Sequence, residues 1–203
     1  AYNEAAVIAA TVSAIAAVCK KRSDIAWRII VADNGSTDGT AQVVTAQGIA
    51  TALMVPGKGK GRAVRFAAEH STSDVFVYID ADLSVDPEHI LEFVSELERD
   101  NADIVVGSRL LDAEHVERGL IRTLSSVFFQ MYMQLVIPVG VLDTQCPLKA
   151  LNITGRRALI ACEETTWFFD IEFLARAYRR KLRIIEAPIR WYEQRYPERK
   201  SKL

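Results

Sequence analysis

The sequence is poor in cysteine, and nothing in it is arranged like a disulfide framework or a zinc site. The three cysteines, Cys19, Cys146 and Cys162, are odd in number, widely spaced and form no CxxC pair. A chain of 203 residues that is 50% hydrophobic can bury a large core without covalent staples. The cysteine content therefore indicates a reducing compartment.

An excess of charge of one sign is also missing. The 25 Lys and Arg residues nearly balance the 26 Asp and Glu residues, for a net charge of -1, which argues against a general nucleic-acid binder. The charge is uneven, because residues 170–203 hold ten Lys or Arg against five Asp or Glu. Two interpretations stay open for this basic end: a surface that faces anionic lipid or phosphate, and a solvated helix face with a frayed tail.

Long apolar runs are absent as well. No run reaches the roughly 18 apolar residues that a membrane span requires. The nearest segment is 127–142, which Gln130, Gln134 and Pro138 interrupt. We expect a buried or interfacial helix there, and the sequence contains no internal repeat or low-complexity linker.

The chain does contain an alternation of strand-like and helix-like segments. Helices are expected over residues 5–19, 37–47, 62–70, 87–99, 118–135 and 170–181. Strands are expected over residues 27–32, 52–55, 75–79, 104–106 and, at a sheet edge because of Pro188, 184–191. This order predicts a Rossmann-like α/β fold, a mostly parallel sheet with helices on both faces that binds ligands beyond the carboxyl ends of its strands. Because the sequence opens directly on a helix, we expect its first strand to be missing.

Two carboxylates follow the strand expected at 75–79. Asp80 and Asp82, two residues apart and entering a loop, can share a hard divalent cation such as Mg²⁺, which takes oxygen ligands. The alternative is that Asp82 caps a turn and Asp80 is merely exposed.

Two glycine-containing loops follow other strands. Asp33 opens a turn over residues 33–39, and its carboxylate can accept hydrogen bonds from a base edge; alternatively the segment is a turn in which Ser36 or Thr37 caps the next helix. Residues 57–61 (Gly-Lys-Gly-Lys-Gly) are basic and can lie over a diphosphate, or form a solvated loop. The spacing of a P-loop is absent.

Further acids stand in apolar surroundings. Asp143 follows the apolar segment, where a carboxylate requires partners or water. Asp170 and Glu172 lie among aromatic residues. A functional role and a local structural role, a turn for Asp143 and a helix N-cap for Asp170, both stay open.

Taken in order, these motifs resemble family 2 glycosyltransferases of the GT-A fold. The resemblance covers nearly the whole chain and rests on Ala1-Tyr-Asn-Glu4, Val31-Ala-Asp-Asn-Gly-Ser-Thr-Asp-Gly-Thr40, Gly59-Lys-Gly-Arg-Ala-Val-Arg65, Asp80-Ala-Asp-Leu-Ser84 and Gly107-Ser-Arg109. The later motifs resemble dolichyl-phosphate glucosyltransferases and the related polyprenyl-phosphate mannosyltransferases. They are Asp143-Thr-Gln-Cys146 with Lys149, Trp167-Phe-Phe-Asp-Ile-Glu172 and Pro188-Ile-Arg-Trp-Tyr-Glu193. Pro147-Leu148 replaces the familiar Gly-Phe, and Pro147 removes a backbone N–H donor.

The resemblance implies one catalytic domain over residues 1–203, with a nucleotide-sugar half at about 1–110 and an acceptor half at about 111–203. Tyr2, Glu4 and Asp33 would border the nucleotide base, Lys60 the diphosphate or base, and Asp80 the ribose and the metal. Asp82 would be the main ligand of Mg²⁺ or Mn²⁺. The sugar and the acceptor phosphate would be lined by Arg109, Asp143 and Lys149, with Asp170 and Glu172 supporting that wall.

The implied activity is inverting transfer of a hexose from a nucleotide sugar, UDP-glucose favoured, to a polyprenyl phosphate of the dolichyl type. The enzyme would act as a peripheral protein at the cytoplasmic face of a membrane. Three alternatives stay open: mannose transfer from GDP-mannose, a family 2 enzyme with a soluble or polysaccharide acceptor, and a sugar nucleotidyltransferase. A fourth is a binding module without catalysis.

Overall fold

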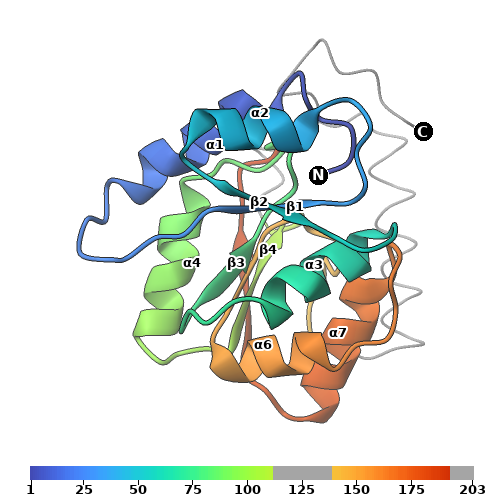
Figure 1. Cartoon of the computed structure of the whole chain (residues 1–203). Helices are drawn as coiled ribbons and strands as arrows, with labels where there is room; N and C mark the ends of the chain where they lie inside the picture. The colour runs from blue at the N-terminus through green and yellow to red at the C-terminus, as the bar shows by residue number, and fades with distance from the viewer. Residues whose placement is uncertain (112–138, 193–203) are drawn as a thin grey trace.

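The computed structural model describes residues 1–111 and 139–192 (Figure 1). The helices are α1 (Ile8–Cys19), α2 (Thr40–Gln47), α3 (Lys60–Glu69), α4 (His89–Glu98), α6 (Ile153–Ile160) and α7 (Phe169–Arg179). The strands are β1 (Ile30–Asp33), β2 (Thr51–Met54), β3 (Phe76–Tyr78), β4 (Ile104–Ser108), β5 (Lys149–Leu151) and β6 (Ile184–Pro188). The predicted α/β class is confirmed.

The strands pair in both directions. β1 and β2 form a parallel pair, and the other four follow the order β3-β5-β4-β6. β6 is parallel to β4 and lies at the edge, as the sequence predicts, whereas β5 is antiparallel to both β3 and β4. The sheet is therefore more mixed than the alternation of strands and helices predicts, because β5 returns from late in the chain into its middle.

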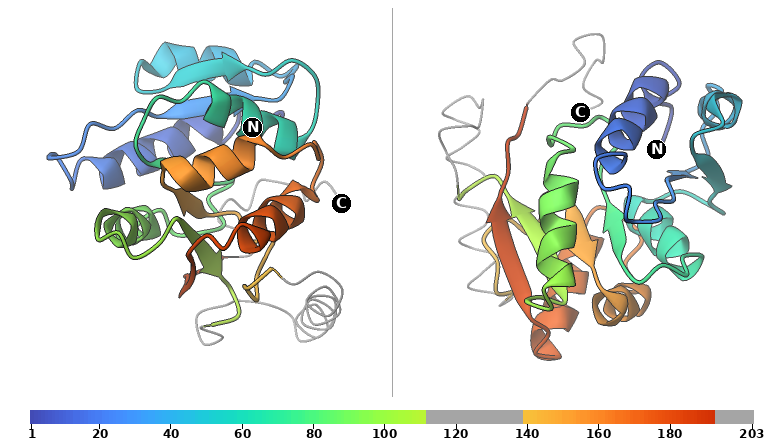
Figure 2. Two further views of the ribbon diagram at one scale, coloured as in Figure 1. Left: turned by 90° about the horizontal axis from the view of Figure 1, so that it is seen from below. Right: turned by 90° about the vertical axis from the view of Figure 1, so that its left-hand side faces the viewer.

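The core lies on both faces of this sheet. Alternate side chains of a strand point to opposite faces, so Ile104 and Val106 pack against the layer of α3, α6 and α7. Val105 points to the other face and packs with Phe93 of α4. Figures 1 and 2 show α4 on one side of the sheet and α3, α6 and α7 on the other.

Several element boundaries differ from the expected ones. α1 begins at Ile8 rather than at residue 5, because a turn in which the Glu4 carbonyl accepts the N–H groups of Val7 and Ile8 precedes it. α2 begins at Thr40, where the carboxylate of Asp38 accepts the Thr40 N–H at 3.0 Å. The expected capping by Ser36 or Thr37 is therefore wrong. β5 and α6 were not predicted at all.

Some expectations concern residues outside the described ranges. The helix expected at 118–135, most of the apolar segment 127–142 and the last part of the basic end lie there. Within residues 1–111 and 139–192, no helix combines the length and the apolar character needed to cross a bilayer.

Candidate functional site

The paired carboxylates stand where β3 ends, two and four residues after Tyr78. Lys60, the first residue of α3, brings its ammonium to 3.0 Å from Asp80 Oδ1 and 3.2 Å from Asp80 Oδ2. Burial alone would lower the pKa of Lys60, but the charges of Asp80, Asp170 and Asp82 raise it above its ordinary value. The loop lysine and the carboxylate pair, remote in sequence, thus form one cluster.

The donor atoms of Asp80 and Asp82 suit a hard divalent cation. Asp82 Oδ1 accepts the Ser84 N–H at 3.1 Å, so the turn contact considered as an alternative role is present. Among the described residues, no group of three or more His, Cys, Asp or Glu side chains gathers as a complete metal site. Mg²⁺ is commonly held by one or two carboxylates completed by substrate phosphates. Asp80 and Asp82 fit a cation of that kind and do not fit one enclosed by protein alone.

Asp33 lies at the end of β1 and is almost fully buried. Its Oδ1 accepts the Ser36 N–H at 3.0 Å, whereas its buried Oδ2 finds no hydrogen-bond partner within the part of the chain that the structure describes. A buried acceptor of this kind is costly unless something donates to it. The segment of Tyr2 and Glu4 packs beside this turn, since the Ala1 carbonyl accepts the Asn34 N–H at 2.9 Å.

Lys149, Asp170 and Tyr78 form a buried cluster at the end of β3. The Lys149 ammonium lies 2.7 Å from Asp170 Oδ1, donates to the Cys146 carbonyl at 2.7 Å and sits over the Tyr78 ring. The Tyr78 hydroxyl donates to the same Asp170 oxygen at 2.8 Å, and burial and the Asp170 charge raise the pKa of Tyr78 well above its ordinary value.

Asp170 and Lys149 have different surroundings in this cluster from those that the sequence predicts. Asp170 lies in the first turn of α7, but its side chain forms an ion pair instead of an N-cap. Lys149 is fully enclosed by protein, and its contact with an acceptor phosphate stays a prediction.

Arg109 and Asp143 form a bidentate ion pair. Nε and Nη2 of Arg109 donate to the two carboxylate oxygens at 2.7 Å each, and the Arg109 backbone N–H donates at 3.0 Å. Burial would raise the pKa of Asp143, but the Arg109 guanidinium holds it below its ordinary value. Glu186 of β6 accepts the Leu142 and Asp143 backbone N–H groups at 2.8 Å each, which fixes the loop. The partner that the sequence requires for Asp143 is therefore Arg109.

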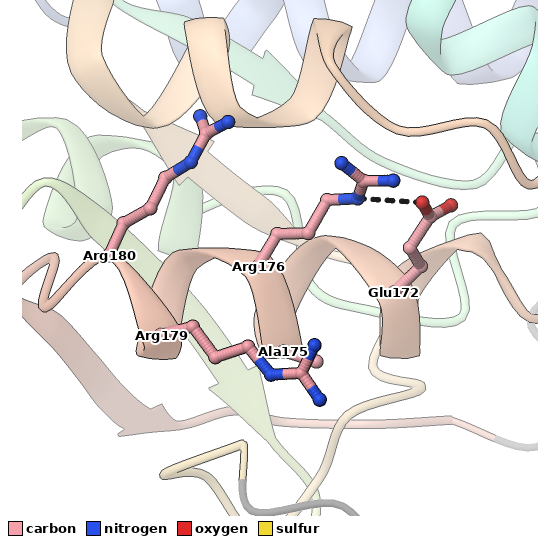
Figure 3. Close-up of a pocket in the computed structure, with 5 residues that line it drawn as sticks. All are labelled: Glu172, Ala175, Arg176, Arg179 and Arg180. Carbon is pink, nitrogen blue, oxygen red and sulfur yellow. Dashed lines mark hydrogen bonds and ion pairs between the residues drawn. The ribbon is translucent and has the colours of Figure 1, made fainter.

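Glu172 is separate from these clusters. Its carboxylate accepts the backbone N–H groups of Glu163 and Glu164 and pairs with Arg176 at 2.7 Å. Burial would raise the pKa of Glu172, but these contacts lower it below its ordinary value. Figure 3 shows Glu172 beside Arg176 on α7, in a hollow of about 540 Å³ that is also lined by Ala175, Arg179 and Arg180. The described lining of this hollow includes none of the carboxylate-pair residues, so we do not assign the donor site to it.

Sequence reasoning did not single out three residues that the structure brings to these clusters. Tyr78 is the last residue of β3 and precedes Asp80 by two residues, but its contact with Asp170 depends on a segment far away in the sequence. Glu186 likewise depends on contacts from distant segments. Trp167 stands in the motif Trp167-Phe-Phe-Asp-Ile-Glu172, but the sequence assigns it no role of its own. The ring of Trp167 lies 5.1 Å from the Lys60 ammonium.

Comparisons with known proteins place this geometry in context. The family model described as Glycosyl transferase family 2 matches residues 1–152. A dolichyl-phosphate beta-glucosyltransferase of Trichomonas vaginalis is 31% identical over 209 residues, covering 95% of this chain and 62% of the relative. Another of Dictyostelium discoideum is 29% identical over 188 residues, covering 86% of this chain and 58% of the relative. The chain thus spans less than two thirds of the length of these relatives.

Among solved structures, glucosyl-3-phosphoglycerate synthase of Mycobacterium tuberculosis has a similar fold. Its complex with Mn²⁺, UDP-glucose and phosphoglyceric acid matches with a TM-score of 0.70 and 22% identity, covering 96% of this chain and 70% of that one. The complex with phosphoglyceric acid gives a TM-score of 0.71. The fold shared with these structures is GT-A.

Proposed function

The chain belongs to glycosyl transferase family 2, and from that membership we propose that it transfers a hexose, with inversion, from a nucleotide sugar to a polyprenyl phosphate. Glucose from UDP-glucose is the favoured donor. The relatives named for dolichyl-phosphate glucosyl transfer, at 31% and 29% identity, support this choice of sugar and acceptor. The observation that carries the proposal is the paired carboxylate at the end of β3 with a lysine beside it.

The nucleotide base would lie against Tyr2, Glu4 and Asp33. The buried Asp33 Oδ2, which has no partner among the described residues, is an acceptor for an N–H on the edge of a uracil or guanine ring. A donor that binds here supplies the missing hydrogen bond and removes the cost of that buried oxygen.

The diphosphate would lie between the base and the carboxylate pair. Asp82, with Asp80 beside it, would hold Mg²⁺ or Mn²⁺. When bound, the cation neutralises the negative charge that develops on the departing diphosphate. Lys60 donates to Asp80 in this structure, and its ammonium would also pair with phosphate oxygens that approach the same carboxylate.

Transfer would proceed by a single displacement. An oxygen of the lipid phosphate attacks the anomeric carbon, the bond to the nucleoside diphosphate breaks, and the diphosphate leaves with the bonding electrons. The lipid phosphate is already an anion at neutral pH, so no side chain has to remove a proton from it. Arg109, whose side chain is 17% exposed, would pair with the acceptor phosphate on the sugar side of the site. Asp143, which is fully buried, would hold the Arg109 guanidinium in position through its two carboxylate oxygens.

Lys149 and Asp170 would act as positioning residues behind this wall, because the structure encloses both side chains. Glu172 would support the wall indirectly, through the loop at Glu163 and Glu164. The donor dissolves in water and the acceptor is a lipid, so we place the enzyme peripherally at a membrane surface, on the cytoplasmic face where nucleotide sugars are made.

The test is transfer of labelled glucose from UDP-glucose to a polyprenyl phosphate in detergent micelles with Mn²⁺. Asp82→Asn should reduce turnover by roughly 10³-fold, the scale of losing a centre that stabilises transition-state charge, without unfolding the protein. Asp74→Asn, an exposed carboxylate before the other end of β3, is the matched control and should transfer at the wild-type rate. Wild-type turnover of Asp82→Asn would sink the metal assignment.

The same assay separates the alternatives. Transfer from GDP-mannose but not from UDP-glucose would make the protein a mannosyltransferase. Donor hydrolysis or polymer formation without glycolipid would indicate a different acceptor, and pyrophosphate release from a nucleoside triphosphate and a sugar phosphate would indicate a nucleotidyltransferase.

A further inference from the structure

Each lysine of the glycine-rich loop at residues 57–61 lies over an aromatic ring. The Lys58 ammonium is 5.0 Å from the centre of the Tyr2 ring and 3.3 Å from its hydroxyl oxygen. The Lys60 ammonium is 5.1 Å from the centre of the Trp167 ring. A ligand that follows this basic loop therefore meets an aromatic side chain beside each of its two cations.

Trp167 reaches this position because its own loop is fastened to the start of α3. The Thr166 carbonyl accepts the Gly61 N–H, and the Thr165 carbonyl accepts the Arg62 N–H, both at 3.1 Å. The approach is close enough to exclude side chains: a Cβ on Gly59 would meet the Thr165 carbonyl oxygen at 2.1 Å. A Cβ on Gly61 would meet the Phe169 side chain at 2.5 Å. These two glycines are thus required for the packing of the loop, independently of any contact between the loop and a diphosphate.

The Trp167 side chain is nevertheless 64% exposed. A large aromatic residue held rigidly by its backbone, yet left open beside a charged cluster, is typical of a ligand wall and not of a core position. Phe168, its neighbour, is similarly exposed at 60%, but no contact places its ring over either loop lysine within the described part of the chain.

We propose that Trp167 is the contact surface for the transferred hexose and contributes to the choice of sugar. This inference rests on the proposed function. Contacts order the loop: Tyr2 is at the Lys58 end, and Asp80 and Trp167 are at the Lys60 end. The turn that begins at Asp33 is joined to the segment of Tyr2, because the Ala1 carbonyl accepts the Asn34 N–H. The hexose is bonded to the phosphate distal to the base. If the diphosphate binds at Asp80 and Lys60, the sugar therefore lies next to the Trp167 ring.

The chemistry of the ring favours a sugar over the other occupants of the site. A hexose whose hydroxyls are equatorial presents a face of C–H groups, which packs on an aromatic face while the hydroxyls stay at the rim. A base would be expected at the Tyr2 end, beside the buried acceptor of Asp33. A lipid chain would pack on the Phe168 ring as well as on the Trp167 ring. Comparing variants of the two residues therefore distinguishes a bound lipid from a bound sugar.

The experiment is calorimetric titration of wild type, Trp167→Ala, Trp167→Phe and Phe168→Ala with UDP and with UDP-glucose, in Mg²⁺, with GDP and GDP-mannose in parallel. Trp167→Ala should lose roughly tenfold in affinity for the nucleotide sugar while its affinity for the nucleoside diphosphate stays unchanged. Trp167→Phe should restore most of the loss. Phe168→Ala, matched in exposure and place, should bind all ligands as wild type does. Circular dichroism checks that each variant is folded.

A second readout follows Trp167 directly. Its fluorescence should change on addition of the nucleotide sugar and not of the nucleoside diphosphate, and this difference should be lost in Trp167→Phe. Equal loss of affinity for both ligands in Trp167→Ala, or no loss, overturns the inference while leaving the proposed function standing. Unchanged ligand affinities with vesicle binding lost in both Trp167→Ala and Phe168→Ala also overturn it and assign the aromatics to lipid. If wild type binds neither donor, the proposed function fails, and this inference fails with it.

Discussion

Two lysine–aspartate pairs of the same chemistry lie in different surroundings. In the Lys60–Asp80 pair the atoms are 3.0 Å apart and the side chains are 14% and 34% exposed. In the Lys149–Asp170 pair the distance is 2.7 Å and the exposures are 0% and 1%. Partly exposed charges are screened by water and contribute little to stability, so they are free to exchange partners, whereas breaking a buried pair leaves an uncompensated charge. Burial thus separates an ion pair suited to substrate binding from one suited to holding the fold.

The largest effect is expected from breaking the buried pair. Lys149→Met leaves the Asp170 carboxylate buried with only the Tyr78 hydroxyl as a donor among the contacts described, and should lower the free energy of unfolding by about 3–5 kcal/mol. Urea denaturation followed by circular dichroism measures this change. Adding Asp170→Asn removes the orphaned charge and should recover a large part of the loss. If Lys149→Met alone were as stable as wild type, the buried pair would not hold the fold as the comparison of the two pairs predicts.

Breaking the partly exposed pair should act on catalysis instead. Lys60→Met should change the free energy of unfolding by less than about 1 kcal/mol. Glucosyl transfer should fall by roughly 10²-fold, because a cation beside the diphosphate is lost. Lys58→Met removes the same charge two residues earlier without touching Asp80, and should lose less activity. If Lys60→Met were destabilising and active, the roles assigned to the two pairs would be reversed.

The Arg109–Asp143 pair sharpens the comparison, because it joins a fully buried carboxylate to a guanidinium that is 17% exposed. The pKa of Asp143 lies below its ordinary value of 3.8. Its stabilisation is therefore complete above pH 3.8 and is lost as the pH falls through the lowered pKa. Asp143→Asn should be less stable than wild type by about 2 kcal/mol at pH 7.

That stability difference should shrink as the pH falls below 3.8, when the wild-type carboxyl also becomes neutral. Urea midpoints measured at a series of pH values test the trend. A gap that stays constant down to the acid limit would show that the ion pair is not the source of the stabilisation.

The sequence predicts the parts of the fold and site that depend on local patterns. Strand ends followed by acids placed Asp33, Asp80 and Asp82, and the apolar surroundings of Asp143 required a partner. The identity of that partner, Arg109, depends on how two loops meet in space. The full burial of Lys149 could not be predicted, since it depends on Tyr78 and Asp170 from distant segments. β5 was missed because three residues, Lys149–Leu151, carry too little periodicity to predict a strand.

The place of β5 has a consequence for how the protein is made. In the sheet, β5 lies between β3 and β4. During synthesis, however, β5 leaves the ribosome about forty residues after β4. Until β5 is synthesised, β3 and β4 lack the strand that pairs with both of them, and the four-stranded sheet cannot form. We therefore expect that residues 1–110 do not fold when they are produced alone, and that a nascent chain stalled near residue 110 binds chaperones.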